Sequence, residues 1–153
     1  MKKTRLFLAA SLLTIGAFST ITMSSCSKDD KICNPGYEGK DCDVESRVKF
    51  VKTWDATDAP VNGTPKIYTC GIVNGTTVTS VIISNSFCNN FFDNNINASV
   101  DGNTITIASQ KPDANGDYTV SGSGSYINGQ ISWNYVLLEN TSGDQVSLSG
   151  TWK

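Results

Sequence analysis

The chain has 153 residues, with 12 basic side chains, 14 acidic side chains and no histidine. Without histidine the usual general base, the Ser-His-Asp arrangement and imidazole-bound metal sites are excluded. Removal of residues 1–25 would take away three basic residues and no acidic one, which leaves 9 basic and 14 acidic side chains. This negative net charge argues against nucleic acid as a partner, because binding to phosphates needs a basic face.

The N-terminal segment has the pattern of a bacterial lipoprotein signal peptide. A cationic start (Lys2, Lys3 and Arg5) precedes an apolar run over residues 6–21, and small residues lead to Cys26. The run is too short and too often interrupted by Ser and Thr for a membrane span, which needs about 20 predominantly apolar residues. We therefore expect cleavage before Cys26, whose acyl chains then anchor the protein in a membrane. Cleavage without lipidation, which would give a secreted protein, is the alternative.

Three charged residues follow Cys26 closely: Lys28, Asp29 and Asp30. This segment resembles the surface-export signal of lipoproteins from the Bacteroides group, in which a lysine and two acidic residues follow the acylated cysteine. The resemblance implies a lipid-anchored protein on the outer face of the outer membrane. A hydrated tether without an export role is the alternative interpretation of the same charges.

Cys33 and Cys42 frame a short loop that matches the closing half of an EGF-like module. Gly36 and Gly39 permit positive φ at its turns, and the spacing allows a small disulfide to close. A complete EGF domain needs six cysteines, so we expect residues 26–45 to be an acylated tether with one disulfide. Because the loop lies outside the strand pattern, we expect its disulfide to stiffen the tether rather than the domain that follows. A receptor-binding role is the alternative.

From residue 46 onwards, apolar and polar residues alternate with the period of two that marks half-buried strands. The alternation predicts eight strands, near residues 47–56, 66–73, 77–85, 95–101, 103–110, 117–127, 130–139 and 145–153. Turn signals separate several of them: Asn74-Gly75, Asp101-Gly102, Asn128-Gly129 and Ser142-Gly143. Short connections favour antiparallel neighbours, and closing the first strand on the last removes both sheet edges. We therefore expect residues 46–153 to form an all-β domain, an eight-stranded antiparallel up-and-down barrel, with a two-sheet sandwich as the alternative.

The chain after the signal also resembles the calycin or lipocalin-like domains of small Bacteroides-type lipoproteins. The resemblance rests on the Cys-x-x-Gly-Tyr-Glu-Gly stalk and on four further segments: Thr53-Trp54, Val81-Ile82-Ile83-Ser84-Asn85, Asn103-Thr104-Ile105-Thr106-Ile107 and Ser121-Gly122-Ser123-Gly124. It implies a lipocalin-like barrel and a surface location. Such proteins mostly lack an assigned activity, so the resemblance carries no functional residues over to this chain.

The acidic residues of the domain fall mainly in expected turns and loops, which favours solvated side chains over a paired acid and base. Asp55 and Asp58 follow the first expected strand, and Asp93 lies in a loop. Asp113 and Asp117 faintly resemble a Ca²⁺ loop, but the distal glutamate of an EF-hand is missing. We expect no catalytic residue, no metal and no cofactor.

Two further cysteines, Cys70 and Cys88, remain in a chain that is expected to reach an oxidising compartment. Their even number favours a second disulfide between them over two free thiols. A hairpin at Asn74-Gly75 argues against this pairing, because it places Cys70 opposite a residue near Thr79.

Aromatic residues supply both the expected core and a candidate contact. Phe91 and Phe92 lie between asparagine runs and are candidates for a surface patch, unless one ring plugs the barrel end. Gly122 and Gly124 would either open interior room or mark close approach of strands. Large side chains expected to face inward recur on most strands: Phe50, Trp54, Tyr68, Trp133, Tyr135 and Trp152. An eight-stranded barrel is just wide enough for side chains to fill, which leaves at best a shallow pocket at one mouth.

Three functions compete on these observations. The first is a non-enzymatic surface lipoprotein whose barrel binds a surface protein, a glycan or another envelope component. The second is a lipocalin-like carrier of a small apolar ligand inside the barrel. The third, an enzyme or enzyme inhibitor, is disfavoured by the missing histidine and the dispersed acids. An interior cavity above about 300 Å³ would favour the carrier.

Overall fold

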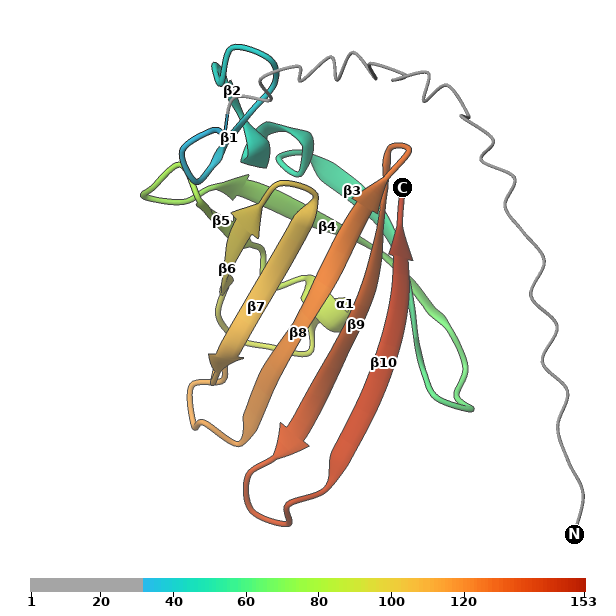
Figure 1. Cartoon of the computed structure of the whole chain (residues 1–153). Helices are drawn as coiled ribbons and strands as arrows, with labels where there is room; N and C mark the ends of the chain where they lie inside the picture. The colour runs from blue at the N-terminus through green and yellow to red at the C-terminus, as the bar shows by residue number, and fades with distance from the viewer. Residues whose placement is uncertain (1–31) are drawn as a thin grey trace, which may run out of the picture.

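The computed structural model describes residues 32–153 and shows eight strands closed into one antiparallel barrel (Figure 1). In chain order the barrel strands are β3 (Thr53–Pro60), β4 (Lys66–Asn74), β5 (Ser80–Ile83), β6 (Ile96–Asp101), β7 (Thr104–Gln110), β8 (Tyr118–Ile127), β9 (Gln130–Glu139) and β10 (Gln145–Trp152). Each strand pairs with the next, and β10 pairs with β3. The predicted up-and-down barrel is therefore confirmed.

The predicted signal peptide, the acylation site Cys26 and the charged residues Lys28, Asp29 and Asp30 lie outside the described residues. Between residues 32 and 153, no helix has the length and apolar character needed to cross a membrane.

The connections alternate between the two ends of the barrel (Figure 1). One end carries residues 32–52 and the β4–β5, β6–β7 and β8–β9 connections, and we call it the stalk end. The opposite end carries the β3–β4, β5–β6, β7–β8 and β9–β10 connections. It includes the short helix α1 (Phe87–Asn90), and we call it the α1 end.

The Cys33–Cys42 disulfide is formed, as predicted. It closes a small element in which β1 (Tyr37–Glu38) pairs with β2 (Val44–Glu45). Gly36 and Gly39 both have a φ of +87°, which confirms that the spacing of the motif supplies its two turns.

The disulfide-stapled segment packs against the stalk end of the barrel. The Arg47 guanidinium donates to the carbonyl oxygens of Gly75 (3.2 Å) and Thr77 (2.7 Å) in the β4–β5 connection. The Lys49 ammonium binds Glu38 of the stapled segment and Asn103 of the β6–β7 turn. These contacts tie residues 36–49 to the barrel, so the stapled segment is joined to the domain, although its position outside the strand pattern suggested that its disulfide would stiffen the tether alone.

The predicted first strand, residues 47–56, is wrong at both of its bounds. Residues Ser46–Lys49 form a 3-10 helix, η1, and β3 runs from Thr53 to Pro60. Val48 is 61% exposed, because hydrogen bonds of η1 to the stalk end replace strand pairing there. The C-terminal bound was missed because the inward position of β3 near its end is occupied by a carboxylate, Asp58, which breaks the apolar alternation.

The predicted third strand, residues 77–85, is shortened to Ser80–Ile83. Residues 75–79 form a longer connection in place of the predicted two-residue turn, and Ile72 pairs with Ile83. The predicted turn at Asn128-Gly129 is confirmed, with a φ of +82° at Gly129. The turn predicted at Asp101-Gly102 lies one residue later, at residues 102–103, because Asp101 pairs with Thr104; Gly102 has a φ of +53°.

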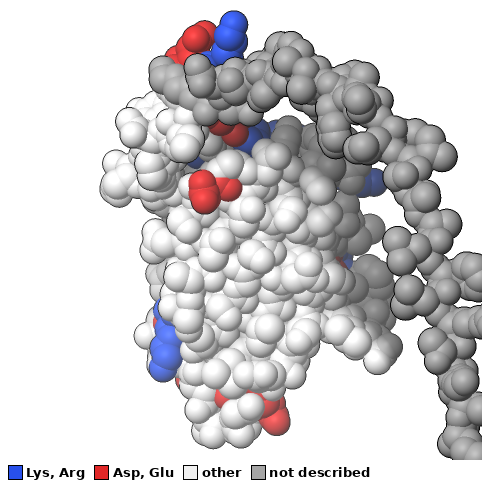
Figure 2. Space-filling view, in the orientation of Figure 1, with Lys and Arg blue, Asp and Glu red and all other residues white. Residues whose placement is uncertain are grey.

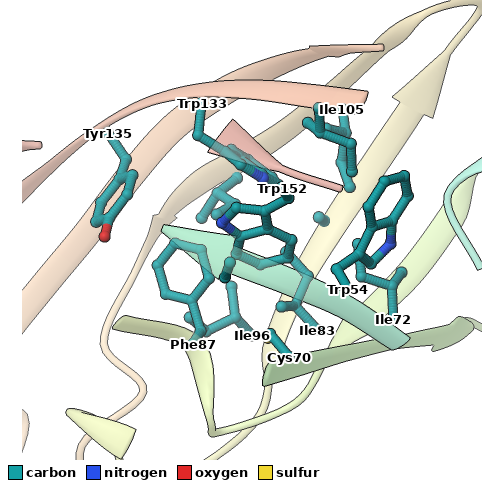
Figure 3. Packing of buried hydrophobic residues seen from close by; sticks show 14 of the residues in the cluster. Trp54, Cys70, Ile72, Ile83, Phe87, Ile96, Ile105, Trp133, Tyr135 and Trp152 are labelled. Carbon is teal, nitrogen blue, oxygen red and sulfur yellow. The ribbon is translucent and has the colours of Figure 1, made fainter. Parts of the chain in front are cut away.

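Aromatic and branched side chains fill the middle of the barrel (Figure 3). The largest buried side chains are Trp54, Trp133, Trp152, Tyr135, Phe50 and Phe87. Gly122 and Gly124 create no interior room. A Cβ atom at Gly122 would lie 2.4 Å from Tyr135 Cβ, and one at Gly124 would lie 2.9 Å from Trp133 Cδ2. Gly122 therefore permits the close approach of β8 to the backbone of β9, and Gly124 permits its close approach to the Trp133 ring.

Candidate functional site

A buried carboxylate, Asp58, lies within the barrel near the α1 end. Only 2% of Asp58 is exposed. Its carboxylate accepts hydrogen bonds from the Tyr68 hydroxyl, from the Tyr135 hydroxyl at 2.7 Å and from the Trp152 Nε1–H at 2.9 Å. Three donors satisfy the charge, as a buried carboxylate requires. The prediction that Asp58 is a solvated turn residue is therefore wrong, whereas Asp55 on the same strand is exposed.

The two tyrosines beside Asp58 stay protonated at neutral pH. Burial, reinforced by the negative charge of Asp58, raises the pKa of Tyr68 well above its ordinary value. Burial is also the main cause that raises the pKa of Tyr135, and nearby Cys88 and Asp58 add to it. Neutral phenols donate hydrogen bonds to the carboxylate, so this group of side chains acts as a structural anchor.

The predicted disulfide between Cys70 and Cys88 is wrong, because both residues have free thiols. The Cys70 sulfur lies 3.5 Å from Ser84 Oγ, next to the β4–β5 pair. Cys88 lies in α1, and its main-chain N–H donates to the Tyr68 hydroxyl at 2.9 Å. Each residue is thus held by a different neighbour. Burial raises the pKa of both thiols, which disfavours the reactive thiolate.

The short element α1 is a single turn of four residues in the β5–β6 connection, and it closes one end of the barrel interior. Cys88, Asn89 and Asn90 have φ of +54°, +61° and +58°, which is the left-handed region. This turn directs the buried Phe87 ring inward, with its centroid 4.8 Å from Tyr135 and 5.7 Å from Trp152 (Figure 3). The hydrogen bond from Cys88 to Tyr68 connects the turn to the Asp58 network.

Phe91 and Phe92, predicted as a surface contact or a plug, have different roles. Phe92 is buried and stacks on Phe87 with ring centroids 6.4 Å apart, so it belongs to the plug. Phe91 is 42% exposed, and its ring meets the Tyr118 ring edge-on at a centroid distance of 4.8 Å. Only Phe91 is therefore available for contact with another molecule.

A cavity of about 250 Å³ opens at the α1 end, and we call it the mouth cup. Its lining consists of Phe91, Tyr118, Leu137, Glu139, Asp144 and Val146. Strand register brings this lining together, because Tyr118 pairs with Glu139 and Leu137 pairs with Val146. The cup has an apolar, aromatic floor and two carboxylates. Apart from Phe91, none of these residues was predicted as part of a site, although the period-two alternation of the sequence gave a signal for Tyr118, Leu137 and Val146.

A second hollow of about 400 Å³ lies across β8, β9 and β10, next to Val61. Its outward-facing lining is uncharged and combines Val136 with four short polar side chains: Ser121, Asn134, Ser147 and Ser149. Much of the molecular face in Figure 2 is uncharged. The hollow has no charged group, and its one aromatic residue, Tyr135, is only 2% exposed and donates its hydroxyl to Asp58. It is therefore a weaker candidate than the mouth cup, whose Phe91 ring is 42% exposed.

The described residues contain no group of three or more Cys, Asp or Glu side chains placed to hold a metal ion. The weak Ca²⁺-like segment folds as a turn, in which Asp113 accepts a hydrogen bond from the Tyr118 N–H at 2.8 Å. Asp93 accepts one from the Ala114 N–H at 3.0 Å. Main-chain amides therefore occupy carboxylate oxygens in this segment.

No protein-family model matches the chain, and a search of curated proteins gives no match. Among solved structures, the chain is similar to EF1p2_mFAP2b bound to DFHBI, with 17% identity, coverage of 71% of this chain and 97% of that chain, and a TM-score of 0.49. It is also similar to a redesigned β-barrel, b11L5F_LGL, with 13% identity, coverage of 71% and 93%, and a TM-score of 0.49. Neither likeness bears on function, and the strand pairing itself establishes the barrel.

Proposed function

We propose that this protein is a non-enzymatic, lipid-anchored cell-surface protein whose barrel is a binding module, and that its ligand occupies the mouth cup. Anchoring through acylated Cys26 and display on the outer membrane rest on the signal sequence and on Lys28, Asp29 and Asp30. The barrel supplies a rigid scaffold for a site at one end. Its stapled segment covers the opposite end.

The observation that carries this proposal is the exposure of apolar side chains over a cavity at the α1 end. Phe91 is 42% exposed and Val146 is 46% exposed, and both line the mouth cup. Exposed apolar side chains around a concavity are typical of binding sites. At about 250 Å³ the cup is smaller than most drug-sized pockets, which favours a compact ligand or one group of a larger molecule.

A non-enzymatic role fits the chemistry of the buried acid. Asp58 has three hydrogen-bond donors, and the neighbouring Phe87 ring contacts Tyr135 and Trp152. A carboxylate held in this way is poorly placed to accept a substrate proton. The chain also has no histidine that could replace it.

The alternative is a carrier that holds a small apolar ligand inside the barrel. Its support is the buried Trp133 Nε1–H, which has no hydrogen-bond partner among the described residues. Against it, the Trp133 ring packs 5.3 Å from Trp152 and 6.0 Å from Phe87 (centroid distances), so aromatic rings occupy the middle of the barrel (Figure 3). An interior ligand would have to displace the buried Phe87 and Phe92 rings, which close the α1 end.

A fluorescence titration with N-phenyl-1-naphthylamine, a neutral apolar probe, tests the binding site. We expect saturable enhancement with the native protein and at least a fivefold loss of affinity in Phe91→Ala. Ile127→Ala is the matched control, because Ile127 is an exposed apolar residue at the stalk end. Absence of saturable binding, or equal losses in the two variants, would overturn the assignment of the cup.

A further inference from the structure

The mouth cup carries two carboxylates without a basic partner. Glu139 accepts a hydrogen bond from the Ser142 hydroxyl at 3.0 Å. Neither Glu139 nor Asp144 forms an ion pair with a lysine or arginine among residues 32–153. Lone pairs on both groups therefore remain available to a ligand that enters the cup.

The β9–β10 turn fixes the position of these carboxylates. The Glu139 N–H donates to the Asp144 carbonyl oxygen and the Gly143 N–H donates to the Glu139 carbonyl oxygen, each at 2.9 Å. The Asp144 N–H also donates to the Ser142 hydroxyl at 3.1 Å. Because the turn is closed by its own hydrogen bonds, its backbone holds both acids at the edge of the apolar floor, where Asp144 is exposed.

The surroundings of the cup are negative as well. Asp93, Asp113 and Asp117 lie in the neighbouring connections of the α1 end, where Lys66 and Lys111 supply the positive charge. Together with the two acids of the cup, these residues give five negative charges against two positive ones. The pKa of Asp113 is raised mainly by burial, and also by repulsion from Asp93 and Asp117. In Figure 2 acidic side chains gather at the lower tip of the molecule.

The floor of the cup suits the body of an organic cation. Phe91 and Tyr118 meet edge-on, and Leu137 and Val146 add aliphatic surface. Aromatic faces attract ammonium groups within about 6 Å, and carboxylates attract them at the rim. A volume of about 250 Å³ accommodates one or two fused rings. An anionic ligand would meet repulsion from both acids, and a bare metal ion would gain nothing from the apolar floor.

We propose that the mouth cup selects small organic cations, with a compact aromatic or aliphatic body on the Phe91–Tyr118 floor and an ammonium group at Glu139 and Asp144. This inference rests on the proposed function of the cup as the binding site. It adds the chemical class of the ligand.

Two probes with the same ring system and opposite charge test the inference: 1-naphthylmethylammonium and 1-naphthylacetate, compared by calorimetric titration at pH 7 and low ionic strength. Each exposed ion pair is worth about 0.2–1 kcal/mol, so attraction of one probe and repulsion of the other by two acids together amount to about 0.8–4 kcal/mol, and we expect about a tenfold preference for the ammonium. The preference should shrink in 0.5 M salt because exposed charges are screened.

The variant pair Glu139→Gln with Asp144→Asn should reduce the preference to about twofold or less. Its control is Asp55→Asn with Asp101→Asn, which removes two exposed charges at the stalk end and should leave the preference unchanged. Equal binding of the two charged probes, or a preference that survives in the cup variant, would overturn the inference while leaving the neutral-probe site intact. Failure of all three naphthalene probes to bind would overturn the proposed function with it.

Discussion

Replacement of Asp58 with asparagine tests the buried network that connects the barrel wall to α1. One carboxylate oxygen accepts hydrogen bonds from Tyr68 and Tyr135, and the other accepts one from Trp152. The amide has only one acceptor oxygen, so its NH₂ group must face either the indole N–H or the two phenols. The Tyr68 oxygen already accepts the Cys88 N–H, which limits how far it can reorient.

The expected loss follows from these donors. Hydrogen bonds to a charged group are worth about 1.5–3 kcal/mol each, and the amide forfeits one or two of them, so we expect a loss of about 2–4 kcal/mol. A domain with about 5–15 kcal/mol of stability survives such a loss. Asp58→Ala is a poorer choice, because it leaves three buried donors unpaired and costs up to about 9 kcal/mol.

Urea unfolding followed by tryptophan fluorescence measures the effect. With a slope of about 1–3 kcal/mol per molar urea, the midpoint of Asp58→Asn should fall by about 1–2 M. Asp55→Asn makes the same change at an exposed position of the same strand and should stay within about 0.5 kcal/mol of the native protein. The reasoning is refuted if the two variants unfold at the same urea concentration as the native protein. Asp58→Asn should also weaken probe binding in the cup, because α1 carries both the Cys88 contact and the chain leading to Phe91.

Four further predictions follow from individual residues. Folding raises the pKa of Tyr135, so the stability that this hydroxyl contributes is complete below about pH 10 and declines by about 1.4 kcal/mol per pH unit above it. In a plot of urea midpoint against pH, Tyr135→Phe should therefore show a smaller decline above about pH 10 than the native protein. Replacement of Cys33 and Cys42 with serine should lower stability by about 1–3 kcal/mol, because the stapled segment is bonded to the barrel, and an unchanged melting temperature would instead support an independent tether. Cys26→Ala should release the protein from membranes or block its maturation, whereas normal processing with unchanged fractionation would contradict lipidation. Alanines at residues 28–30 should keep the lipid but reduce protease accessibility on whole cells, and equal accessibility would remove the export signal.

Local patterns predicted most of the barrel wall. The alternation of Ile105 and Ile107 with threonines, bounded by Asp101-Gly102, fixes a strand and its turn within a few residues. Such signals are sufficient because each depends on neighbours in the chain. The same logic correctly placed the disulfide of Cys33 and Cys42, whose loop closes on itself.

The buried network was missed because its members are distant in sequence. Asp58 is 10 residues from Tyr68, 77 from Tyr135 and 94 from Trp152. An isolated aspartate near the end of a strand has the pattern of a turn residue, and only the closed barrel brings its three donors together. The β5–β6 connection was difficult to predict for a related reason. The even number of cysteines favoured a disulfide between Cys70 and Cys88, but Cys88 lies in a left-handed turn and both thiols are free.

Methyl-resolved NMR during titration with N-phenyl-1-naphthylamine tests most directly whether binding occurs at the mouth rather than within the barrel. Leu137 and Val146 line the cup, whereas Ile105 and Ile131 are buried in the core. We expect saturable shifts of the Leu137 and Val146 methyl groups, with those of Ile105 and Ile131 nearly unchanged. Large shifts of the two isoleucines with little change at the cup would contradict the account and place the ligand inside the barrel.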